Sequence, residues 1–298
     1  MLLHLSDLHF GTEREVCIQA IRDFCELHRP EAVIVSGDLT QRARLKQFFD
    51  CRQFLDSLDL PYLVVPGNHD IPLFHVWNRF FSPFVRYQAF FGRLETTLET
   101  PNFYIVGVNS IRRRYHTRGH VSLEQIHEVA EKLRNAPNNK TKLVVFHQPF
   151  YTFPHDHGDK DCPVLAKIAL EQWGKTGLWG LLHGHLHKVA IHDLNQVFNL
   201  GFDHSIYDIH AGTAISNRLR FGLSNSFNII SANGKIEHYW FDENEKKFLK
   251  SNSVDLLVNH FFVGLKNHQK SINFLFLPLK PFFLTPQMWH IKFFVHCY

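Results

Sequence analysis

Short apolar segments that end in polar, chemistry-bearing side chains constrain this sequence more than any other feature. Three of them fall within the first 70 residues: LLHLS (2–6) before Asp7 and His9, AVIVSG (32–37) before Asp38, and YLVVPG (62–67) before Asn68, His69 and Asp70. Apolar runs of this length, each followed by a loop signal, are typical of buried β-strands. The polar residues are therefore expected just beyond the ends of three strands.

The segments between these strands have the spacing of amphipathic helices. Residues 13–28 carry apolar side chains at helical intervals and stop before Pro30, and residues 41–59 are expected to form a second helix. The buried face of this second helix should comprise Leu45, Phe48, Phe49, Phe54, Leu55 and Leu58. Alternation of strands and helices favours parallel βαβ units, which bind ligands beyond the carboxyl ends of their strands. The sequence thus predicts an α/β fold with a site at those ends.

The rest of the first 250 residues extends this pattern. We expect strands at 102–110, 142–149 and 178–187, helices at 122–135 and near 163–174, and a partly helical aromatic insertion at 71–92. Residues 189–241 alternate short strands with turns, and Asn233–Gly234 is a hairpin signal. This last region is expected to be antiparallel and to close the domain.

Histidine is abundant, with 22 in 298 residues, and several histidines lie near strand ends. His147 lies near the end of one later strand, and His183, His185 and His187 end another. Together with the earlier carboxylates and Asn68 they offer oxygen and imidazole ligands, which suit manganese, iron or zinc. Two ligand groups around a shared carboxylate would hold two divalent ions about 3.5–4 Å apart, the spacing found in phosphoester hydrolases.

Five ordered motifs resemble the signature of the calcineurin-like metallophosphoesterases. They are DLH (7–9), GDL (37–39), GNHD (67–70), His147 and GHLH (184–187). The longer phrases HLSDLHFG, SGDLTQRA and VPGNHD resemble the bacterial branch that includes class III cyclic-nucleotide phosphodiesterases. The resemblance implies a four-layer αββα sandwich of two mixed sheets, with a dinuclear metal site at one edge of the sheets.

The resemblance also implies a role for each motif residue. One ion would be bound by Asp7, His9, Asp38 and His187, and the other by Asp38, Asn68, His147 and His185. Asp38 would therefore bridge the two ions. His69 would contact the phosphate and help protonate the leaving alkoxide, with Asp70 orienting its ring. The implied activity is hydrolysis of a small phosphoester, with a 3′,5′-cyclic nucleotide as the best single substrate.

The motif residues bind only the metals and the phosphate, so they do not identify the rest of the substrate. A phosphomonoesterase, a nuclease and a nucleotide-lipid pyrophosphatase would use the same ligands. A non-catalytic interaction module on the same fold would be expected to have lost ligands, and no ligand departs from the pattern here. A net charge of +4 gives no argument for a stable nucleic-acid partner. No motif indicates an oligomeric state.

Four further features have both a structural and a functional interpretation. His183 is expected either to support the site from a position beside His185 or to be structural. Arg112–Arg114 could bind phosphate, although a solvated charge run is the simpler interpretation. Residues 153–161 form a polar loop that could border the cleft. The aromatic residues of the insertion favour core packing, with stacking on a base as the alternative: Phe74, Trp77, Phe80, Phe81, Phe84, Tyr87, Phe90 and Phe91.

The composition changes near residue 251. Residues 251–298 contain eight phenylalanines, four lysines and a single acid, Asp255. We therefore expect a catalytic domain over 1–250 and a basic, Phe-rich extension over 251–298. The extension could contact an anionic membrane surface weakly, pack on the domain as extra core, or have no selected role.

Cysteine content and the start of the chain bear on the compartment. The five cysteines form no CxxC pair, so neither a disulfide framework nor a zinc knuckle is indicated. Asp7 and His9 interrupt the first apolar stretch before it reaches the length that a signal peptide requires. We therefore expect a cytoplasmic protein.

Overall fold

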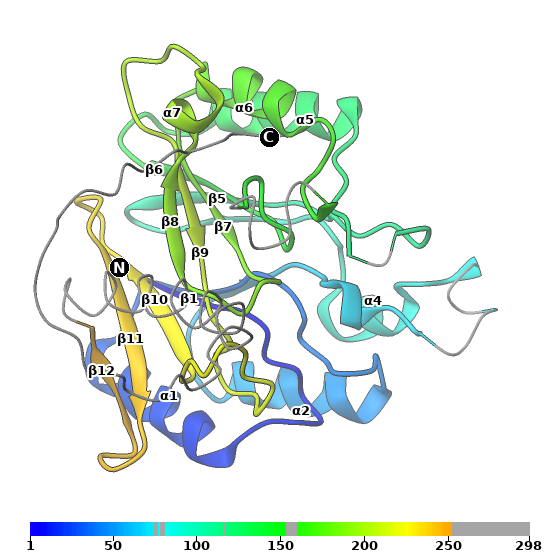
Figure 1. Ribbon diagram of the computed structural model, residues 1–298, viewed down its shortest axis with the longest axis vertical. Helices are drawn as coiled ribbons and strands as arrows, with labels where there is room; N and C mark the ends of the chain where they lie inside the picture. The colour runs from blue at the N-terminus through cyan, green and yellow to red at the C-terminus, as the bar shows by residue number, and fades with distance from the viewer. Residues whose placement is uncertain (74–76, 78–80, 116, 153–159, 252–298) are drawn as a thin grey trace, which may run out of the picture. The chain divides into compact units, whose positions relative to one another are not determined.

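Within the residues that the structure describes, two six-stranded mixed sheets form the framework (Figure 1). This computed structural model describes residues 1–73, 77, 81–115, 117–152 and 160–251. Across the first sheet the strands follow the order β12 (Lys247–Lys250), β11 (Ile236–Asp242), β10 (Ser226–Ile230), β1 (Leu2–Leu5), β2 (Ala32–Val35) and β3 (Tyr62–Val64). Strands β1 to β3 are parallel, and β10 to β12 pair antiparallel.

The second sheet has parallel central strands and antiparallel edges. Its order is β4 (Thr97–Glu99), β5 (Phe103–Gly107), β6 (Thr141–Val145), β7 (Leu178–His183), β9 (Tyr207–His210) and β8 (Ala190–Asp193). Because β9 pairs in parallel with β7, the expectation of a wholly antiparallel region at 189–241 is wrong. The hairpin signal at Asn233–Gly234 is confirmed, since it lies in the turn between β10 and β11, where the N–H of Gly234 donates to Ser231.

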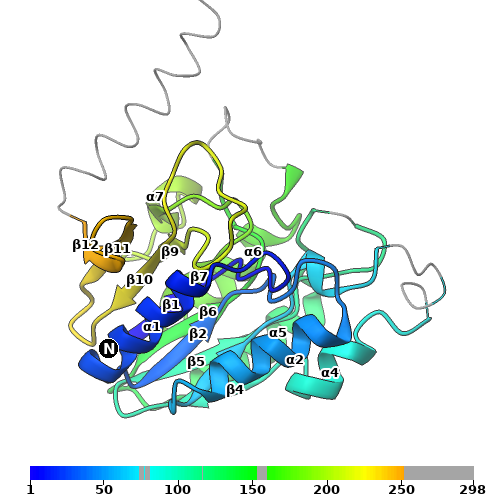
Figure 2. The same ribbon diagram turned by 90° about the horizontal axis from the view of Figure 1, so that it is seen from below.

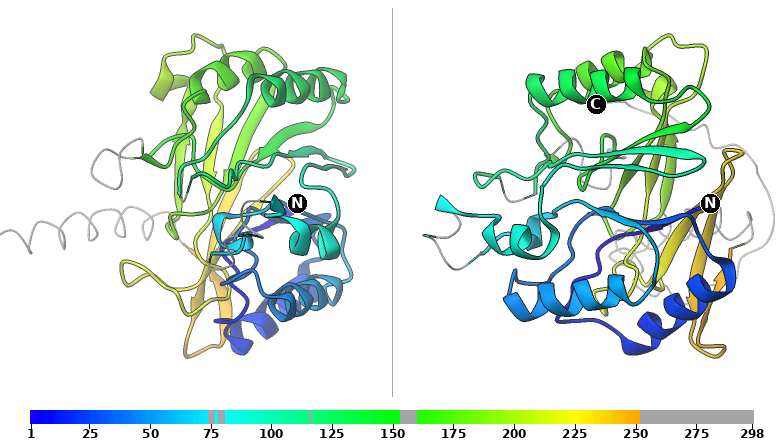
Figure 3. Two further views of the ribbon diagram at one scale, coloured as in Figure 1. Left: turned by 90° about the vertical axis from the view of Figure 1, so that its right-hand side faces the viewer. Right: turned by 180° about the vertical axis from the view of Figure 1, so that it is seen from behind.

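Helices cover the outer face of each sheet (Figures 1 and 3). The helices are α1 (Glu15–His28), α2 (Leu45–Asp56), α4 (Val85–Phe91), α5 (Leu123–Asn135), α6 (Ala166–Gly174) and α7 (Leu194–Phe198), with a 3-10 turn, η1 (Asn68–Asp70). Helices α1 and α2 lie on the first sheet, and α5 and α6 lie on the second. A third apolar cluster, which includes Leu2, Ile34, Phe103 and Leu143, fills the space between the sheets. The order helix, sheet, sheet, helix confirms the four-layer sandwich.

The site motifs follow the carboxyl ends of five parallel strands, which are β1, β2 and β3 of the first sheet and β6 and β7 of the second. Figure 2 shows the sandwich with α1 and α2 in front of the first sheet. The N–H of Asp7 donates to the carbonyl of Gly37, and that of Gly184 donates to His147. Each of these bonds fastens together two loops of one sheet. The backbone N–H of His185 donates to Oδ2 of Asp7 at 3.0 Å, and this bond joins the loops of both sheets at one site.

The prediction of which residues form the buried face of α2 is partly wrong. Leu45 and Phe49 of α2 are exposed, although periodicity grouped them with the buried Phe48. The two lie four residues apart and share a ridge that flanks the buried stripe of Phe48, Cys51 and Leu55. Apolar residues on such a flanking ridge extend the pattern in the sequence without entering the core.

The aromatic insertion divides into a packed and an exposed part. Tyr87 on α4 is buried, and its hydroxyl donates to the carbonyl of Val64 at 3.0 Å. Trp77 and Phe81, by contrast, are 77% and 74% exposed and stack on each other. The expectation of core packing therefore fails for these two residues, while Phe74 and Phe80 lie outside the described residues.

No helix in the described ranges is long and apolar enough to cross a membrane. Strand β12 ends at Lys250, and residues 252–298 lie outside the described part of the chain. The division into a catalytic domain and a Phe-rich extension therefore stays a prediction.

Candidate metal centre

Asp7, His9 and His187 bring their ligand atoms into one buried cluster. Oδ1 of Asp7 lies 3.6 Å from Nε2 of His9 and 3.3 Å from Nε2 of His187. The two Nε2 atoms are 3.3 Å apart. Among the described residues Oδ1 of Asp7 has no hydrogen-bond partner, although it is fully buried. An orphaned carboxylate oxygen that faces two imidazoles fits a divalent cation.

Asp38 faces this cluster and a second one. Its Oδ2 lies 3.7 Å from Nε2 of His9, and its Oδ1 lies 3.4 Å from Nε2 of His147. Oδ1 of Asn68 is 3.1 Å from Nε2 of His147 and 3.0 Å from Nδ1 of His185. The two oxygens of Asp38 thus point to different ligand groups, as a bridging carboxylate requires.

Hydrogen bonds on the far side of two imidazoles select their tautomers. Nδ1 of His147 lies 2.8 Å from the carbonyl oxygen of Ser36. Nδ1 of His187 lies 2.9 Å from the carbonyl oxygen of Arg218 and 2.7 Å from the hydroxyl of Thr213. Because a carbonyl only accepts, Nδ1 carries the proton in each ring and Nε2 keeps its lone pair. Both rings therefore present a free ligand atom to the centre.

The electrostatics of the cluster favour metal-binding protonation states. Burial opposes ionisation of Asp7, but His187 and His9 hold the pKa of this carboxyl well below its usual range. Burial likewise opposes ionisation of Asp38, but His147, His69 and His9 together outweigh it, so the pKa of Asp38 is also lowered. Burial lowers the pKa of His187 to about 4. Ionised carboxylates and neutral imidazoles are the forms that bind metal.

The backbone of the site is strained at five of the expected ligands. Left-handed φ angles between 47° and 68° occur at Asp7, His9, Asp38, His185 and His187. A non-glycine residue in this region costs on the order of 1–3 kcal/mol and is held there by its surroundings. Glycine is needed beside them, because a Cβ on Gly67 would overlap Asp38 and one on Gly184 would overlap Ser6 and Asp7. The sharp turns after the strands aim the ligands at one place.

His69 presents its Nε2 to the cleft. Its Nδ1 lies 3.0 Å from the carbonyl oxygen of Gln41, and its backbone N–H donates to Oδ1 of Asp38 at 2.8 Å. Burial lowers the pKa of His69, and the charge of Asp38 partly opposes this shift. The ring is thus anchored through Nδ1, and its Nε2 faces Nη1 of Arg218 at 3.4 Å, beside the carboxylate expected to bridge the metals.

Asp70 does not orient the His69 ring, so that part of the expected role is wrong. The carboxylate of Asp70 accepts the backbone N–H groups of Leu39, Thr40 and Gly67, and the Thr40 hydroxyl. It therefore fastens η1 to the turn that follows β2. Consecutive side chains of a 3-10 turn point about 120° apart, so sequence neighbours do not face each other.

His183 is structural and does not lie beside His185. The expectation assumed a strand through the GHLH motif, but β7 ends at His183, and His185 has a left-handed φ. Nε2 of His183 lies 2.6 Å from Oδ1 of the buried Asp208, whose Oδ2 is 2.7 Å from Nε2 of His210. The ring therefore joins β7 to β9.

An arginine that the sequence analysis did not single out reaches the centre. Arg112 braces the start of α5, because its guanidinium donates to Oε1 of Gln125 and to the carbonyl of Asn109. Arg218 approaches instead, with Nη1 3.3 Å from Nε2 of His9 and 3.4 Å from Nε2 of His69. The signal missed was SNRLR (216–220), which lies beyond the carboxyl end of β9. It was missed because this strand was expected to be antiparallel.

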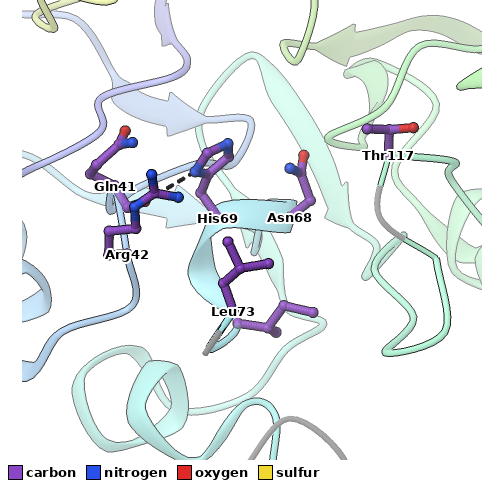
Figure 4. A pocket seen from close by; sticks show the side chains of 7 residues that line it. Gln41, Arg42, Asn68, His69, Leu73 and Thr117 are labelled. Atoms are coloured by element: carbon purple, nitrogen blue, oxygen red, sulfur yellow. Dashed lines mark hydrogen bonds between the residues drawn. The ribbon is translucent and has the colours of Figure 1, made fainter. Parts of the chain in front are cut away.

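Two cavities adjoin the centre and share Asn68, His69 and Thr117. The larger, about 280 Å³, is lined by Asp38, Asn68, His69, Thr117, Lys160, Asp161, His185, Leu186, His187 and Arg220. The smaller, about 180 Å³, is lined by Gln41, Arg42, Asn68, His69, Ile71, Leu73 and Thr117 (Figure 4). The end of the polar loop therefore borders the cleft through Lys160 and Asp161, while residues 153–159 lie outside the described part of the chain.

A comparison with known families agrees with this geometry. The sequence profile of the calcineurin-like phosphoesterases matches residues 1–189. The chain belongs to this family. Calcineurin-like phosphoesterases are metal-dependent hydrolases with a dinuclear metal site, and the structure offers two groups of candidate ligands for one: Asp7, His9 and His187, and Asp7, Asp38 and His147.

Curated relatives and a solved structure give further similarity. Over 85 residues the chain is 32% identical to the glycerophosphodiester phosphodiesterase GpdQ of Enterobacter lignolyticus. This match covers 24% of this calcineurin-like chain and 29% of the relative. Over 215 residues it is 23% identical to a probable glycerophosphodiester phosphodiesterase GpdQ of Arcobacter nitrofigilis. This match covers 67% of this chain and 76% of the relative. A purple acid phosphatase from yellow lupin (Lupinus luteus) seeds shares the fold at 12% identity and a TM-score of 0.60, over 86% of this chain and 54% of that one.

These relatives extend beyond the matched segments. The chain spans less than a third of the length of the Enterobacter enzyme and about half of the lupin phosphatase. The comparisons show the fold and the family of the chain.

Proposed function

We propose that this calcineurin-like protein hydrolyses phosphodiesters at a centre of two divalent metal ions, with manganese, iron or zinc as the candidates. The proposal is carried by the orientation of Asp38, whose two carboxylate oxygens face different ligand groups. One carboxylate oxygen turns to His9 and the other to His147, while the orphaned Oδ1 of Asp7 lies in the same cluster. This donor set, with oxygen and imidazole ligands, suits divalent first-row metals.

The ligands divide into two sets around Asp38. We assign one ion to Asp7, His9, Asp38 and His187, and the other to Asp38, Asn68, His147 and His185. When bound, the two ions would supply positive charge for the phosphoryl oxygens and bring the pKa of water to roughly 7, so that hydroxide is available at neutral pH. Protonation of the leaving group depends on the protein's own side chains.

His69 is the group best situated to act on the leaving alcohol. His69 lines both cavities, and its Nδ1 is bonded to the Gln41 carbonyl, so Nε2 is the nitrogen left for the substrate. A proton at Nε2 can therefore pass to the alkoxide oxygen as the ester bond breaks. The low pKa that burial gives this imidazole makes its protonated form a stronger acid, although that form is then less populated at neutral pH. Asp70 supports His69 only by holding the η1 turn.

Two substrate classes are supported by different observations. The motif phrases favour a 3′,5′-cyclic nucleotide, and the names of the curated relatives favour a glycerophosphodiester. Both are phosphodiesters of small alcohols, which suits the paired cavities of about 280 and 180 Å³. Weak membrane contact through residues 252–298 and a cytoplasmic location stay predictions.

The test combines metal analysis with a substrate panel. The purified protein is loaded with manganese, and bound metal is measured by mass spectrometry. It is then assayed on bis(p-nitrophenyl) phosphate, 3′,5′-cyclic AMP, glycerophosphocholine and p-nitrophenyl phosphate. We expect two ions per chain and faster turnover of diesters than of the monoester. A protein with no bound metal and no turnover would instead be a non-catalytic module on this fold.

A further inference from the structure

Residues 211–218 connect the two sheets beside the candidate metal centre. This segment, which we call the 211–218 loop, follows β9 of the second sheet and leads toward β10 of the first. The N–H of Ala211 donates to the carbonyl of His183 at the end of β7, and that of Ala214 donates to Ser6 just after β1. The loop lies beyond residue 189, where the match to the family ends. None of the motif residues named above therefore belongs to it.

The 211–218 loop is fixed from behind by a buried amide. Asn225 is fully buried, and its Nδ2 donates to the carbonyls of Thr213 at 3.2 Å and of Ser216 at 2.8 Å. Its Oδ1 accepts from Nη1 of Arg14 at 2.8 Å. The N–H of Ser226 donates to the carbonyl of Thr213 as well. Since both protons and the oxygen of the amide are bonded, this network holds the loop in one conformation.

The loop also supports the turn that carries His9. The hydroxyl of Thr12 donates to the carbonyl of His9 at 2.9 Å, and it lies 2.9 Å from the hydroxyl of Ser216. The N–H of Asn217 donates to the carbonyl of Thr12. The position of His9 therefore depends in part on the 211–218 loop.

Thr213 places a hydroxyl behind the imidazole of His187. Its Oγ1 lies 2.7 Å from Nδ1 of His187, and the carbonyl oxygen of Arg218 lies 2.9 Å from the same nitrogen. Thr213 is only 2% exposed, so water hardly competes for this contact. Because the carbonyl only accepts, Nδ1 carries the proton and shares it between two oxygens. Oxygens in this position orient a ligating ring and raise the basicity of its other nitrogen, Nε2.

The contact belongs to one of the two ligand groups. Nε2 of His187 lies 3.3 Å from Oδ1 of Asp7 and 3.3 Å from Nε2 of His9. His147, in the other group, has its Nδ1 held by the carbonyl of Ser36. The hydroxyl of Thr213 should therefore act on one ion more than on the other.

We infer that Thr213 is a positioning residue whose hydroxyl strengthens binding of the ion assigned to Asp7, His9, Asp38 and His187. The inference rests on the proposed dinuclear centre and adds to it a residue outside the segment that matches the family. Loss of a partner behind a ligating imidazole typically weakens metal binding by about 10–100-fold. Because the carbonyl behind the ring remains in every side-chain variant, we expect the lower end of that range.

The test is a manganese titration of the full-length protein by isothermal titration calorimetry. Thr213→Val removes the hydroxyl and keeps the branched shape of the side chain. In this variant one of the two ions should bind about tenfold more weakly, and the other should bind as in the parent protein. Thr213→Ser, which keeps the hydroxyl, should restore most of the affinity. Thr213→Ala, a second variant without the hydroxyl, should weaken the same ion.

Nuclear magnetic resonance of the metal-free protein provides a readout that does not depend on metal or turnover. The buried Nδ1 proton of His187 should give a slowly exchanging downfield resonance, identified by its absence in His187→Ala. This resonance should move upfield in Thr213→Val, because one of its two acceptors is lost. A hydroxyl that only stabilised the loop would leave the resonance in place.

Ser226→Ala is the matched control. Ser226 is 1% exposed, and its Oγ has no hydrogen-bond partner among the described residues. Its N–H bonds to the carbonyl of Thr213, so the substitution removes a buried hydroxyl beside the loop without removing a contact to a ligand ring. Both manganese affinities and the resonance of His187 should remain those of the parent protein.

The negative outcomes have different meanings. Parent-like affinity for both ions in Thr213→Val would overturn the inference and leave the proposed function intact. Equal weakening of both ions, or the same weakening in Ser226→Ala, would also overturn it, because the substitution would then act on the fold and not on His187. A parent protein that binds no manganese would end the proposed function and this inference with it.

Discussion

The backbone N–H of His69 donates to Oδ1 of Asp38 at 2.8 Å, and the same oxygen lies 3.4 Å from Nε2 of His147. One carboxylate therefore fixes the turn that carries the proposed acid and faces a proposed metal ligand. The geometry couples the position of the His69 ring to the metal centre, because η1 is tied to Asp38 at its main chain. Measuring metal content together with turnover should distinguish a substitution that removes a metal ligand from one that removes the proposed acid.

Replacement of Asp38 by asparagine should abolish hydrolysis and lower bound metal below two ions per chain. The reason is that a neutral amide offers one oxygen lone-pair donor and cannot serve two cations. Metal content is measured by mass spectrometry, and turnover with an aryl phosphodiester. Asp50→Asn, which removes an ion pair with the exposed Lys46 on α2, is the control and should retain both ions. Full metal content with parent turnover in Asp38→Asn would contradict the bridging assignment.

His69→Ala should retain both metals and lose turnover of alkyl esters by roughly 10²–10⁴-fold, the usual effect of one acid–base group. The loss should be smaller for a p-nitrophenyl ester, because p-nitrophenoxide leaves without protonation. The measurement is kcat for matched alkyl and aryl diesters. An equal loss with both leaving groups would remove the general-acid role.

His4 should make the stability of the metal-free protein depend on pH. Burial, followed by the charges of His183 and His210, lowers the pKa of His4 from 6.5 to about 3. Between these values the unfolded chain binds one more proton than the folded chain. The free energy of unfolding should therefore fall as the pH drops below 6.5, by about 1.4 kcal/mol per pH unit from this group.

The check is urea unfolding of the metal-free protein between pH 4 and 7, compared with His4→Gln. Glutamine can donate to Ser36, which lies 2.9 Å from Nε2 of His4. The variant should be less stable at pH 7 and show a shallower pH slope by about 1.4 kcal/mol per unit. Parallel slopes for the two proteins would show that His4 does not remain neutral in the fold.

A chain that ends near residue 250 should fold, bind two metals and hydrolyse an aryl phosphodiester at a rate similar to that of the full chain. Every proposed ligand lies before residue 188, and β12 ends at Lys250. Circular dichroism, metal analysis and turnover check this. Loss of metal in the shortened chain would make the extension part of the catalytic domain. Sedimentation with anionic vesicles, compared with and without the extension, tests the membrane contact.

The sequence by itself determined the elements that depend on local pattern. Apolar runs before Asp7, Asp38 and Asn68 predicted buried strands, and helical spacing at 13–28 predicted α1, because both signals are written in consecutive residues. The order of the metal-binding motifs could also be read from the sequence, since each motif is a strand end followed by its ligand.

Only the tertiary structure decided how distant segments meet. The parallel pairing of β9 with β7, which brings Arg218 to the centre, joins segments far apart in the chain and leaves no local signal. The direction of Asp70 toward the turn after β2, and away from the His69 ring, follows from the geometry of the η1 turn. Exposure of Trp77 depends on which surface the insertion leaves uncovered. Periodicity reports which residues are apolar, but it does not report which strand or helix will pack against them.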